Sequence, residues 1–158
     1  MSDMNKDCTG AGVIVYTKEL DRKDHEDCVH YLVLKLDHYL DLPKGGIDHG
    51  EDFVSAATRE TQEECNLKAG SDYVLEEDFI CFSGDRLAMY LGKYNMDPSD
   101  PYRNVNINRN EKTGVYEHDD AVWLTLKEIM SGAHGQLYPY LNKPLLVAED
   151  YIFNNSKV

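Results

Sequence analysis

Three glutamates in one short segment are the residues of this chain best suited to chemistry. Glu60, Glu63 and Glu64 stand at positions i, i+3 and i+4, so their carboxylates would share one face of a helix. Like charges on neighbouring turns destabilise an isolated helix by about 0.2–0.5 kcal/mol per pair, which favours a cation between them. Crowded carboxylate oxygens suit Mg²⁺ or Mn²⁺, which retain water and share the phosphate oxygens of a substrate. A solvated acidic helix face is the alternative that these three residues alone leave open.

The residues before and after the glutamates predict the elements that would position them. Apolar or small side chains recur with the spacing of one helical face, at Phe53, Ala56, Ala57 and Thr61. Upstream, Pro43 favours an extended chain that leads into a turn at Gly45 and Gly46. Glycine would let backbone carbonyls of that turn approach a metal ion, because it has no side chain to block them.

The charged positions in residues 42–67 resemble the signature of the Nudix family, G-x5-E-x7-R-E-U-x-E-E-x-G-U, in which U is a bulky aliphatic residue. The glycine and all the charged positions match, at Gly45, Glu51, Arg59, Glu60, Glu63 and Glu64. Two positions depart from the signature, since Thr61 replaces an aliphatic residue and Asn66 replaces the second glycine. Asparagine is the non-glycine residue that best tolerates a left-handed conformation, so we expect the turn after the helix to be retained.

Within that family the chain resembles the diadenosine tetraphosphate hydrolases. These enzymes carry Pro-Lys-Gly and Arg-Glu-Thr at the places of residues 43–45 and 59–61, and a Glu-His pair shortly before a tryptophan-bearing strand. The corresponding residues here are Glu117, His118 and Trp123. Pro-Lys-Gly also occurs in RNA 5′-pyrophosphohydrolases and decapping enzymes. The segment 95–114 is longer than that resemblance leads one to expect, so it leaves the substrate contacts open.

The resemblance implies roles for individual acidic and basic residues. A divalent metal, Mg²⁺ or Mn²⁺, would be held by the Gly45 carbonyl, Glu60, Glu63, Glu64 and Glu117. The catalytic residues would be Glu64, Glu117, Arg59 and Glu63. Among these, Glu117 would act as an extra metal ligand or general base, and Arg59 would orient a carboxylate. Glu51 would anchor the junction between loop and helix.

Substrate contacts follow from the same resemblance. Lys44 would meet phosphate as a point charge at the mouth of the glycine turn. Five tyrosines are candidates for stacking on a nucleobase: Tyr90, Tyr94, Tyr102, Tyr138 and Tyr140. Among them we predict Tyr90 as the stacking residue. Packing in the core is the alternative for each of them, because the chain has 11 tyrosines.

The function implied is metal-dependent hydrolysis of a nucleoside diphosphate linked to another moiety, in which water attacks the phosphate chain. Dinucleoside polyphosphates such as diadenosine tetraphosphate are the favoured small-molecule nucleotide substrates. ADP-ribose, another nucleotide and the 5′ end of RNA are alternatives, and a non-catalytic nucleotide-binding module is a further one. The net charge of −13 repels polyanions at long range, which disfavours a long nucleic acid as partner.

Composition places the chain among globular proteins of one domain. Its 158 residues suffice for a single core, and no apolar run approaches the ~20 residues that span a bilayer. The polar N-terminus shows no signal peptide, so we expect a soluble, intracellular and cytoplasmic protein without membrane contact. The four cysteines lack CxxC spacing, which argues against zinc and fits reduced thiols.

The remaining segments predict an α/β fold. We expect strands at residues 10–18, 28–36, 74–82, 86–94 and around 121–124. Helices are expected at 126–130, capped by Thr125 with Glu128 in its third position, and at 142–153, capped by Asn142. Segment 20–27 should be a hairpin connection and 132–139 a loop. Segment 95–114 should also be a loop, either a substrate lid or a solvated excursion. Strands flanked by helices in this order fit a mixed β-sheet sandwiched between α-helices.

Overall fold

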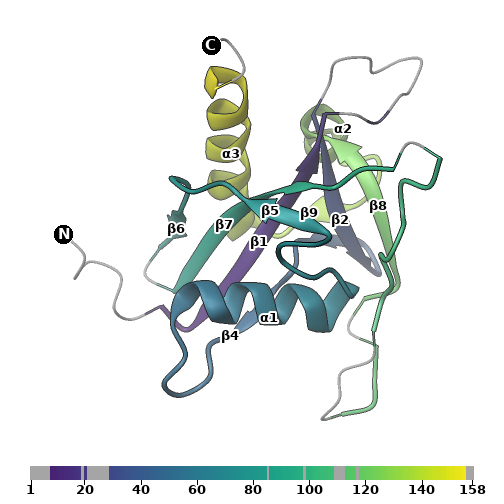
Figure 1. Cartoon of the computed structure of the whole chain (residues 1–158). Coiled ribbons are helices and arrows are strands. Elements are labelled where there is room, and N and C mark those ends of the chain that lie inside the picture. The colour runs from purple at the N-terminus through teal and green to yellow at the C-terminus, as the bar shows by residue number, and fades with distance from the viewer. Residues whose placement is uncertain are drawn as a thin grey trace.

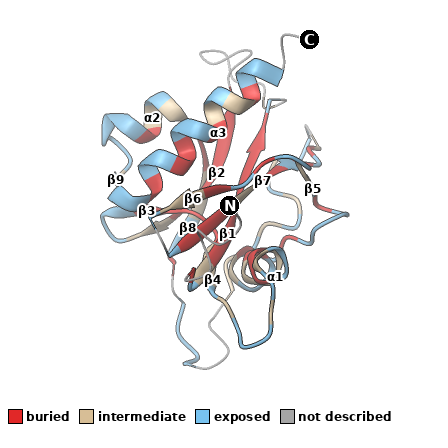
Figure 2. Cartoon of the chain, turned by 90° about the vertical axis from the view of Figure 1, so that its left-hand side faces the viewer, coloured by how far each residue is buried: buried red, intermediate tan, exposed pale blue. Residues whose placement is uncertain are grey.

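The computed structural model describes residues 8–18, 20, 29–84, 86–97, 99–108, 113–116 and 118–155. Helix α1 (Phe53–Cys65) lies on one face of a mixed sheet, and helices α2 (Leu126–Ser131) and α3 (Asn142–Asn155) lie on the other, as Figures 1 and 2 show. The predicted α/β fold, a mixed sheet between helices, is therefore confirmed. None of the helices in these residues is long and apolar enough to cross a membrane.

The sheet is built around strand β1. Its strands among the described residues are β1 (Gly10–Thr17), β2 (His30–Leu36), β3 (Tyr39–Asp41), β4 (Lys44–Gly46), β5 (Tyr73–Leu75), β6 (Cys81–Ser83), β7 (Leu87–Tyr94), β8 (Asp120–Thr125) and β9 (Gln136–Leu137). The main path runs β5-β7-β1-β2-β3-β9, while β4 pairs with β1, β6 with β7 and β8 with β2. The pairs β1–β7 and β3–β9 are parallel and the others are antiparallel.

The middle of strand β1 is continuously apolar because both faces of the sheet are covered there. In β1, Val13 and Val15 pack in the core beneath α1, whereas Ile14 and Tyr16 pack in the core beneath α2 and α3. All four side chains are buried. Figure 2 shows the same pattern as buried strands between the two helical layers. The sheet is therefore a rigid platform from which loops and α1 can present polar residues.

Several elements were predicted correctly from residues that are close together in the sequence. Helix α2 begins with the predicted capping box, in which Glu128 N donates to the Thr125 hydroxyl at 3.1 Å and Thr125 N donates to the Glu128 carboxylate at 2.9 Å. The strands expected at 10–18, 28–36, 86–94 and around 121–124 are found as β1, β2, β7 and β8. The expected connection at 20–27 lies outside the described residues, except for Leu20.

Three predicted elements differ from the structure. The single strand expected at 74–82 is two strands, β5 and β6, which both pair with β7 and are separated by the charged run 76–78. The loop expected at 132–139 contains β9, which pairs with β3. Asn142 is not a cap, because the 3-10 turn Pro139–Leu141 leads directly into α3 and Asn142 is already helical at φ −58° and ψ −50°.

Candidate functional site

Helix α1 has a defined cap at each end, and its buried face shows which way its other side chains point. At its start, the Asp52 carboxylate accepts a hydrogen bond from Ser55 N at 2.8 Å. At its end, Asn66 adopts the left-handed conformation, φ 65° and ψ 22°, so that prediction is confirmed. The buried face consists of Ala56, Ala57, Thr61 and Cys65. The glutamates of the helix therefore face away from the core beneath α1.

Thr61 stands where the family signature has an aliphatic residue, and its hydroxyl is satisfied within the helix. The side chain is fully buried, and its hydroxyl donates to the Ala57 carbonyl at 2.8 Å. A buried hydroxyl with a backbone partner avoids the penalty of an unpaired polar group. The departure at position 61 thus leaves the packing of α1 intact.

Gly45 and Gly46 form a strand, and the prediction of a turn there is wrong. Both belong to β4, in which Gly45 is opposite Ala11 of β1, and the turn comes later, at Gly50 with φ 82°. A β-carbon on Gly45 would lie only 2.0 Å from Glu60 Oε1. Glycine is thus needed because the carboxylate of α1 packs directly on the strand backbone.

Arg59 connects the acidic residues around α1. Its Nε and Nη2 atoms donate to the two Glu51 oxygens at 2.8 and 2.9 Å, and Nη2 also donates to the Gly46 carbonyl at 2.7 Å. Nη1 donates to Glu60 at 3.0 Å and to Glu63 at 3.2 Å. The hydrogen bonds from Arg59 lower the pKa of Glu51 to about 2. The guanidinium therefore orients several carboxylates together and fixes the junction between β4 and α1.

Lys44 links β4 to the last glutamate and to a second acid. Its backbone N–H donates to Glu64 Oε1 at 3.2 Å, while its ammonium lies 3.3 Å from Asp41 Oδ1. The ammonium also lies 5.3 Å from the centre of the Tyr140 ring, a distance suited to a cation–π interaction. The ammonium of Lys44 at the cleft is therefore already in contact with the Asp41 carboxylate and the Tyr140 ring.

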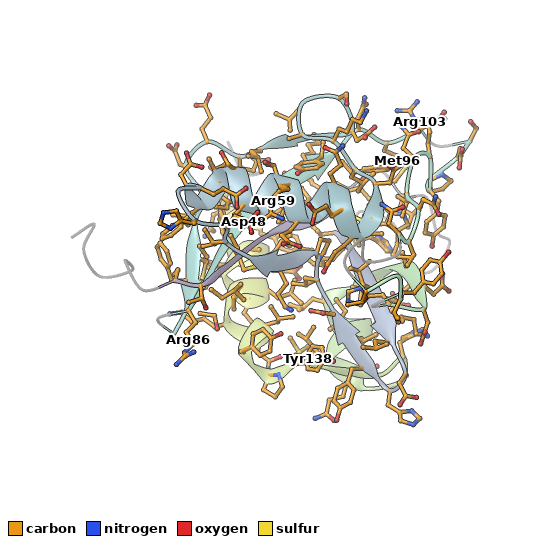
Figure 3. The ribbon with its side chains drawn as sticks, turned by 90° about the horizontal axis from the view of Figure 1, so that it is seen from below. Asp48, Arg59, Arg86, Met96, Arg103 and Tyr138 are labelled. Atoms are coloured by element: carbon orange, nitrogen blue, oxygen red, sulfur yellow. The ribbon has the colours of Figure 1, made fainter. Side chains whose placement is uncertain are left out.

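A cleft of about 1620 Å³ brings most of the predicted site residues together. Its lining includes Lys44, Gly45, Arg59, Glu60, Glu63 and Glu64. Asp41 and His118 also line it, and neither was singled out from the sequence as a site residue. Figure 3 shows Arg59 beside Asp48 at α1, 3.6 Å apart as an ion pair, with Tyr138 on the other side of the sheet.

Two predicted site residues are not placed in this cleft. Glu117 lies outside the described residues, although its neighbour His118 lines the cleft wall. Tyr90 does not line the cleft; it is half-buried on β7 and packs against the core beneath α1, where burial raises the pKa of its hydroxyl. Its predicted stacking on a nucleobase is therefore without support from its position.

The tyrosine next to the cleft is Tyr140. It is 45% exposed and belongs to a row in which Tyr39 stacks on Tyr138 at 5.0 Å and Tyr138 stacks on Tyr140 at 5.8 Å between ring centres. Tyr39 was missed because it lies far from the others in sequence. The parallel pairing of β3 with β9 brings Tyr39 beside Tyr138 and Tyr140, and no pattern in the nearby sequence predicts that pairing.

The donor set fits a hard divalent cation. It consists of oxygen atoms from carboxylates on consecutive turns of α1, beside a strand backbone that no side chain shields at Gly45. Arg59 lies between Glu60 and Glu63. Among the residues that the structure describes, no three acidic, histidine or cysteine side chains converge as a metal site. Glu60 and Glu63 are thus held by Arg59, whereas Glu64 accepts a hydrogen bond from Lys44 N.

The family follows from a comparison of the whole sequence with known domains. The sequence pattern of the NUDIX domain matches residues 10–142, which include β1 to β9 and the whole of α1. The chain belongs to the Nudix family.

Similar proteins include hydrolases of that family. Rat bis(5′-nucleosyl)-tetraphosphatase (asymmetrical) is 35% identical over 68 residues, which cover 41% of this chain and 46% of the rat protein. The chain spans about half the length of the curated relatives that it matches. A crystal structure of a Caenorhabditis elegans Ap4A hydrolase binary complex has a TM-score of 0.66 and 24% identity, covering 92% of this chain and 98% of that one. The Nudix hydrolase RenU of M. smegmatis has a TM-score of 0.65 and 12% identity, covering 94% and 87%. At these identities the structural likeness shows the Nudix fold alone.

Residues 104–108 of the long segment 95–114 are docked on the end of the Nudix helix. Asn106 N donates to the Cys65 carbonyl at 3.0 Å, and Asn108 N donates to the Glu64 carbonyl at 3.3 Å. Further along, the Trp123 indole donates to the Pro101 carbonyl at 3.0 Å. Figure 1 shows this segment passing beside the end of α1. These contacts argue against a solvated excursion for residues 99–108.

Asn66 joins that docking, because its side-chain amide donates to the Asn104 carbonyl at 3.1 Å. Asn66→Gly removes this exposed hydrogen bond and loosens the unfolded chain, but it relieves the left-handed conformation, so we expect the free energy of unfolding to fall by less than about 1 kcal/mol. Asn66→Ala loses the same hydrogen bond and keeps the strain, so we expect a decrease of about 2 kcal/mol. Urea unfolding of both variants measures the difference, and equal stability of the two would contradict the role of the backbone conformation.

Proposed function

We propose that this Nudix protein hydrolyses dinucleoside polyphosphates such as diadenosine tetraphosphate in a metal-dependent reaction. The observation that carries the proposal is the cleft in which the carboxylates of Glu60, Glu63 and Glu64 meet the bare backbone of Gly45 and the side chain of Lys44. The printed names of the rat and C. elegans relatives support the choice of substrate. The proposed reaction breaks an anhydride bond of the phosphate chain by attack of water.

In this proposal the chain's own residues bind, orient and balance charge. Glu60, Glu63 and Glu64, with the Gly45 carbonyl, would hold Mg²⁺ or Mn²⁺. Such a cation neutralises phosphate charge and lowers the pKa of a bound water. Arg59 would keep the carboxylates in place through the hydrogen bonds that already join it to Glu60 and Glu63. Glu117 is proposed as an additional ligand or as the base that takes a proton from water.

The volume of the cleft and the net charge of the chain support a small-molecule substrate with more than one bulky group. A volume of about 1620 Å³ exceeds the ~300–1,000 Å³ of ordinary small-molecule sites, which leaves room for a phosphate chain with a group at each end. Lys44 is proposed as a phosphate contact. Tyr140, half-exposed and next to Lys44, replaces Tyr90 as the proposed stacking partner of a nucleobase. The net charge of −13 disfavours long nucleic acids.

Removal of divalent metal is expected to abolish hydrolysis of diadenosine tetraphosphate, and added Mg²⁺ or Mn²⁺ should restore it. The assay separates products by chromatography for a panel that also contains ADP-ribose and a short RNA with a 5′-triphosphate. Turnover that persists in excess chelator would contradict the metal-dependent mechanism. Faster hydrolysis of ADP-ribose or of the RNA end would keep the mechanism and replace the substrate, whereas nucleotide binding without any turnover would favour a non-catalytic module.

A further inference from the structure

Asp41, at the end of β3, is a buried acid with partners from different segments. Its carboxylate lies 3.0 Å from His118 Nε2 and 3.3 Å from Lys44 Nζ, and it accepts a hydrogen bond from Leu42 N at 2.8 Å. Asp41 is 6% exposed and His118 is 5% exposed. Carboxylates are seldom buried to this degree unless they are paired, so these contacts explain how Asp41 is tolerated.

The charges of Asp41 and Lys44 are both present at neutral pH. Burial alone would raise the pKa of the Asp41 carboxyl, but the hydrogen bond with His118 and the charge of Lys44 lower it overall. Burial would lower the pKa of Lys44, but the charge of Asp41 raises it overall, with help from Tyr140 and Glu64. The ammonium of Lys44 lies 3.3 Å from Asp41 Oδ1, so Asp41 is the carboxylate that offsets its charge at the cleft wall.

The electrostatic balance of the cleft follows from this pairing. Lys44 and Arg59 are the cations that meet the acids, yet Arg59 is held by Glu51, Glu60 and Glu63. With Lys44 paired to Asp41, neither Lys44 nor Arg59 offers a phosphate an uncompensated positive charge; Lys68, which follows α1, is a further lysine of the lining. An anion that binds in the cleft is repelled by the remaining carboxylates of its wall. Salt screens this repulsion only weakly, because the site is partly buried.

We propose that Asp41 determines when the cleft accepts a phosphate chain: by neutralising Lys44, it makes binding at Lys44 depend on a divalent cation that offsets the glutamates of α1. The inference rests on the proposed function only in taking the anion to be a phosphate chain. Asp41 touches the reacting groups only through Lys44, so it is a specificity-determining residue and not a catalytic one. Its presence would reduce capture of free nucleotides and phosphate that carry no metal.

The test is the binding of inorganic tripolyphosphate to the whole chain in excess EDTA at low ionic strength, followed by phosphorus NMR. Asp41→Asn should raise the association constant about tenfold or more over the parent protein, because it leaves the charge of Lys44 uncompensated. In Asp41→Asn/Lys44→Met the gain should vanish, since the effect acts through Lys44. With Mg²⁺ present, the difference between parent and Asp41→Asn should shrink.

Asp48→Asn is the matched control. Asp48 lines the same cleft and pairs with Arg59 at 3.6 Å, but its side chain is 67% exposed. Asp48→Asn therefore removes one negative charge, as Asp41→Asn does, and leaves the pairing of Lys44 with Asp41 unchanged. We expect a change of less than about threefold for this variant. An equal gain in Asp48→Asn, or no gain in Asp41→Asn, would overturn the proposal. Asp41→Ser gives the same loss of charge should the amide disturb folding, which circular dichroism would reveal.

The outcome is separable from the proposed function. Hydrolysis of diadenosine tetraphosphate is measured on the parent protein and does not enter the binding comparison. If the parent protein hydrolyses no nucleotide but Asp41→Asn gains metal-free affinity for tripolyphosphate, the role of Asp41 stands and the reaction is reassigned. If hydrolysis is found and the gain is absent, the reaction stands and the role of Asp41 is lost.

Discussion

Glu64→Gln is expected to lower kcat for diadenosine tetraphosphate by more than about 100-fold while the fold stays intact. Glu64 is proposed as a metal ligand, and removal of even the outer partners of a metal site commonly decreases affinity or activity 10- to 100-fold. The glutamine keeps the size of the side chain and can still accept the hydrogen bond from Lys44 N. The loss should therefore appear in turnover and in the Mg²⁺ concentration required, with little change in melting temperature.

The matched control for this variant is Glu77→Gln. Glu77 is an exposed acid between β5 and β6, outside the cleft lining, so its replacement removes the same charge without touching the site. Steady-state kinetics over a range of Mg²⁺ concentrations would compare both variants with the parent protein. If Glu64→Gln retains near-parental rates at saturating Mg²⁺, the metal role assigned to α1 is wrong.

Glu117→Gln is expected to lower kcat at least about tenfold with little change in KM. A general base typically contributes 10²- to 10⁴-fold, and loss of a base affects the attacking water more than the bound substrate. The position of Glu117 lies outside the described residues, and its assignment rests on the Glu-His pair before Trp123. His118 lines the cleft wall, which makes the neighbouring residue a reasonable source of a carboxylate.

Two aspartates that follow His118 serve as controls because the structure gives each of them another task. The Asp119 carboxylate accepts a hydrogen bond from Asp37 N at 2.9 Å, and the Asp120 carboxylate accepts one from Ala121 N at 2.8 Å. Asp119→Asn and Asp120→Asn should therefore change kcat much less than Glu117→Gln. A larger loss of kcat in either aspartate variant would require the base to be reassigned.

Short-range chemistry made some parts of this protein predictable from sequence. The capping box at Thr125 and the left-handed Asn66 depend on residues a few positions apart, and both are found. The spacing of the glutamates also correctly placed Glu60, Glu63 and Glu64 on one side of α1, where all three line the cleft. These features follow from the helical repeat and from backbone sterics, which any single sequence carries.

Long-range pairing explains what the sequence did not reveal. Gly45 was expected in a turn because nothing nearby shows that β4 pairs with β1. Asp41 and His118 are 77 positions apart in the sequence, and only the folded chain brings their side chains together. Tyr90 was assigned to the site because a sheet covered on both faces gives no alternation from which to read the direction of a side chain. Except at Tyr90, what was missed thus depends on a contact between distant segments.

Because residues 104–108 dock on α1, we expect the end of α1 and this distant loop to unfold locally as one unit. The carbonyls of Glu64 and Cys65 would normally face water at a helix terminus, but here they accept hydrogen bonds from Asn108 N and Asn106 N, and the Asn108 side chain also donates to the Gln62 carbonyl. Opening of the loop therefore exposes these carbonyls, and fraying of the last turn releases the loop. Proteins open in such cooperative groups, with free energies well below that of global unfolding. The fraction of molecules in which Glu63 and Glu64 are correctly ordered would then depend on asparagines some forty residues away along the chain.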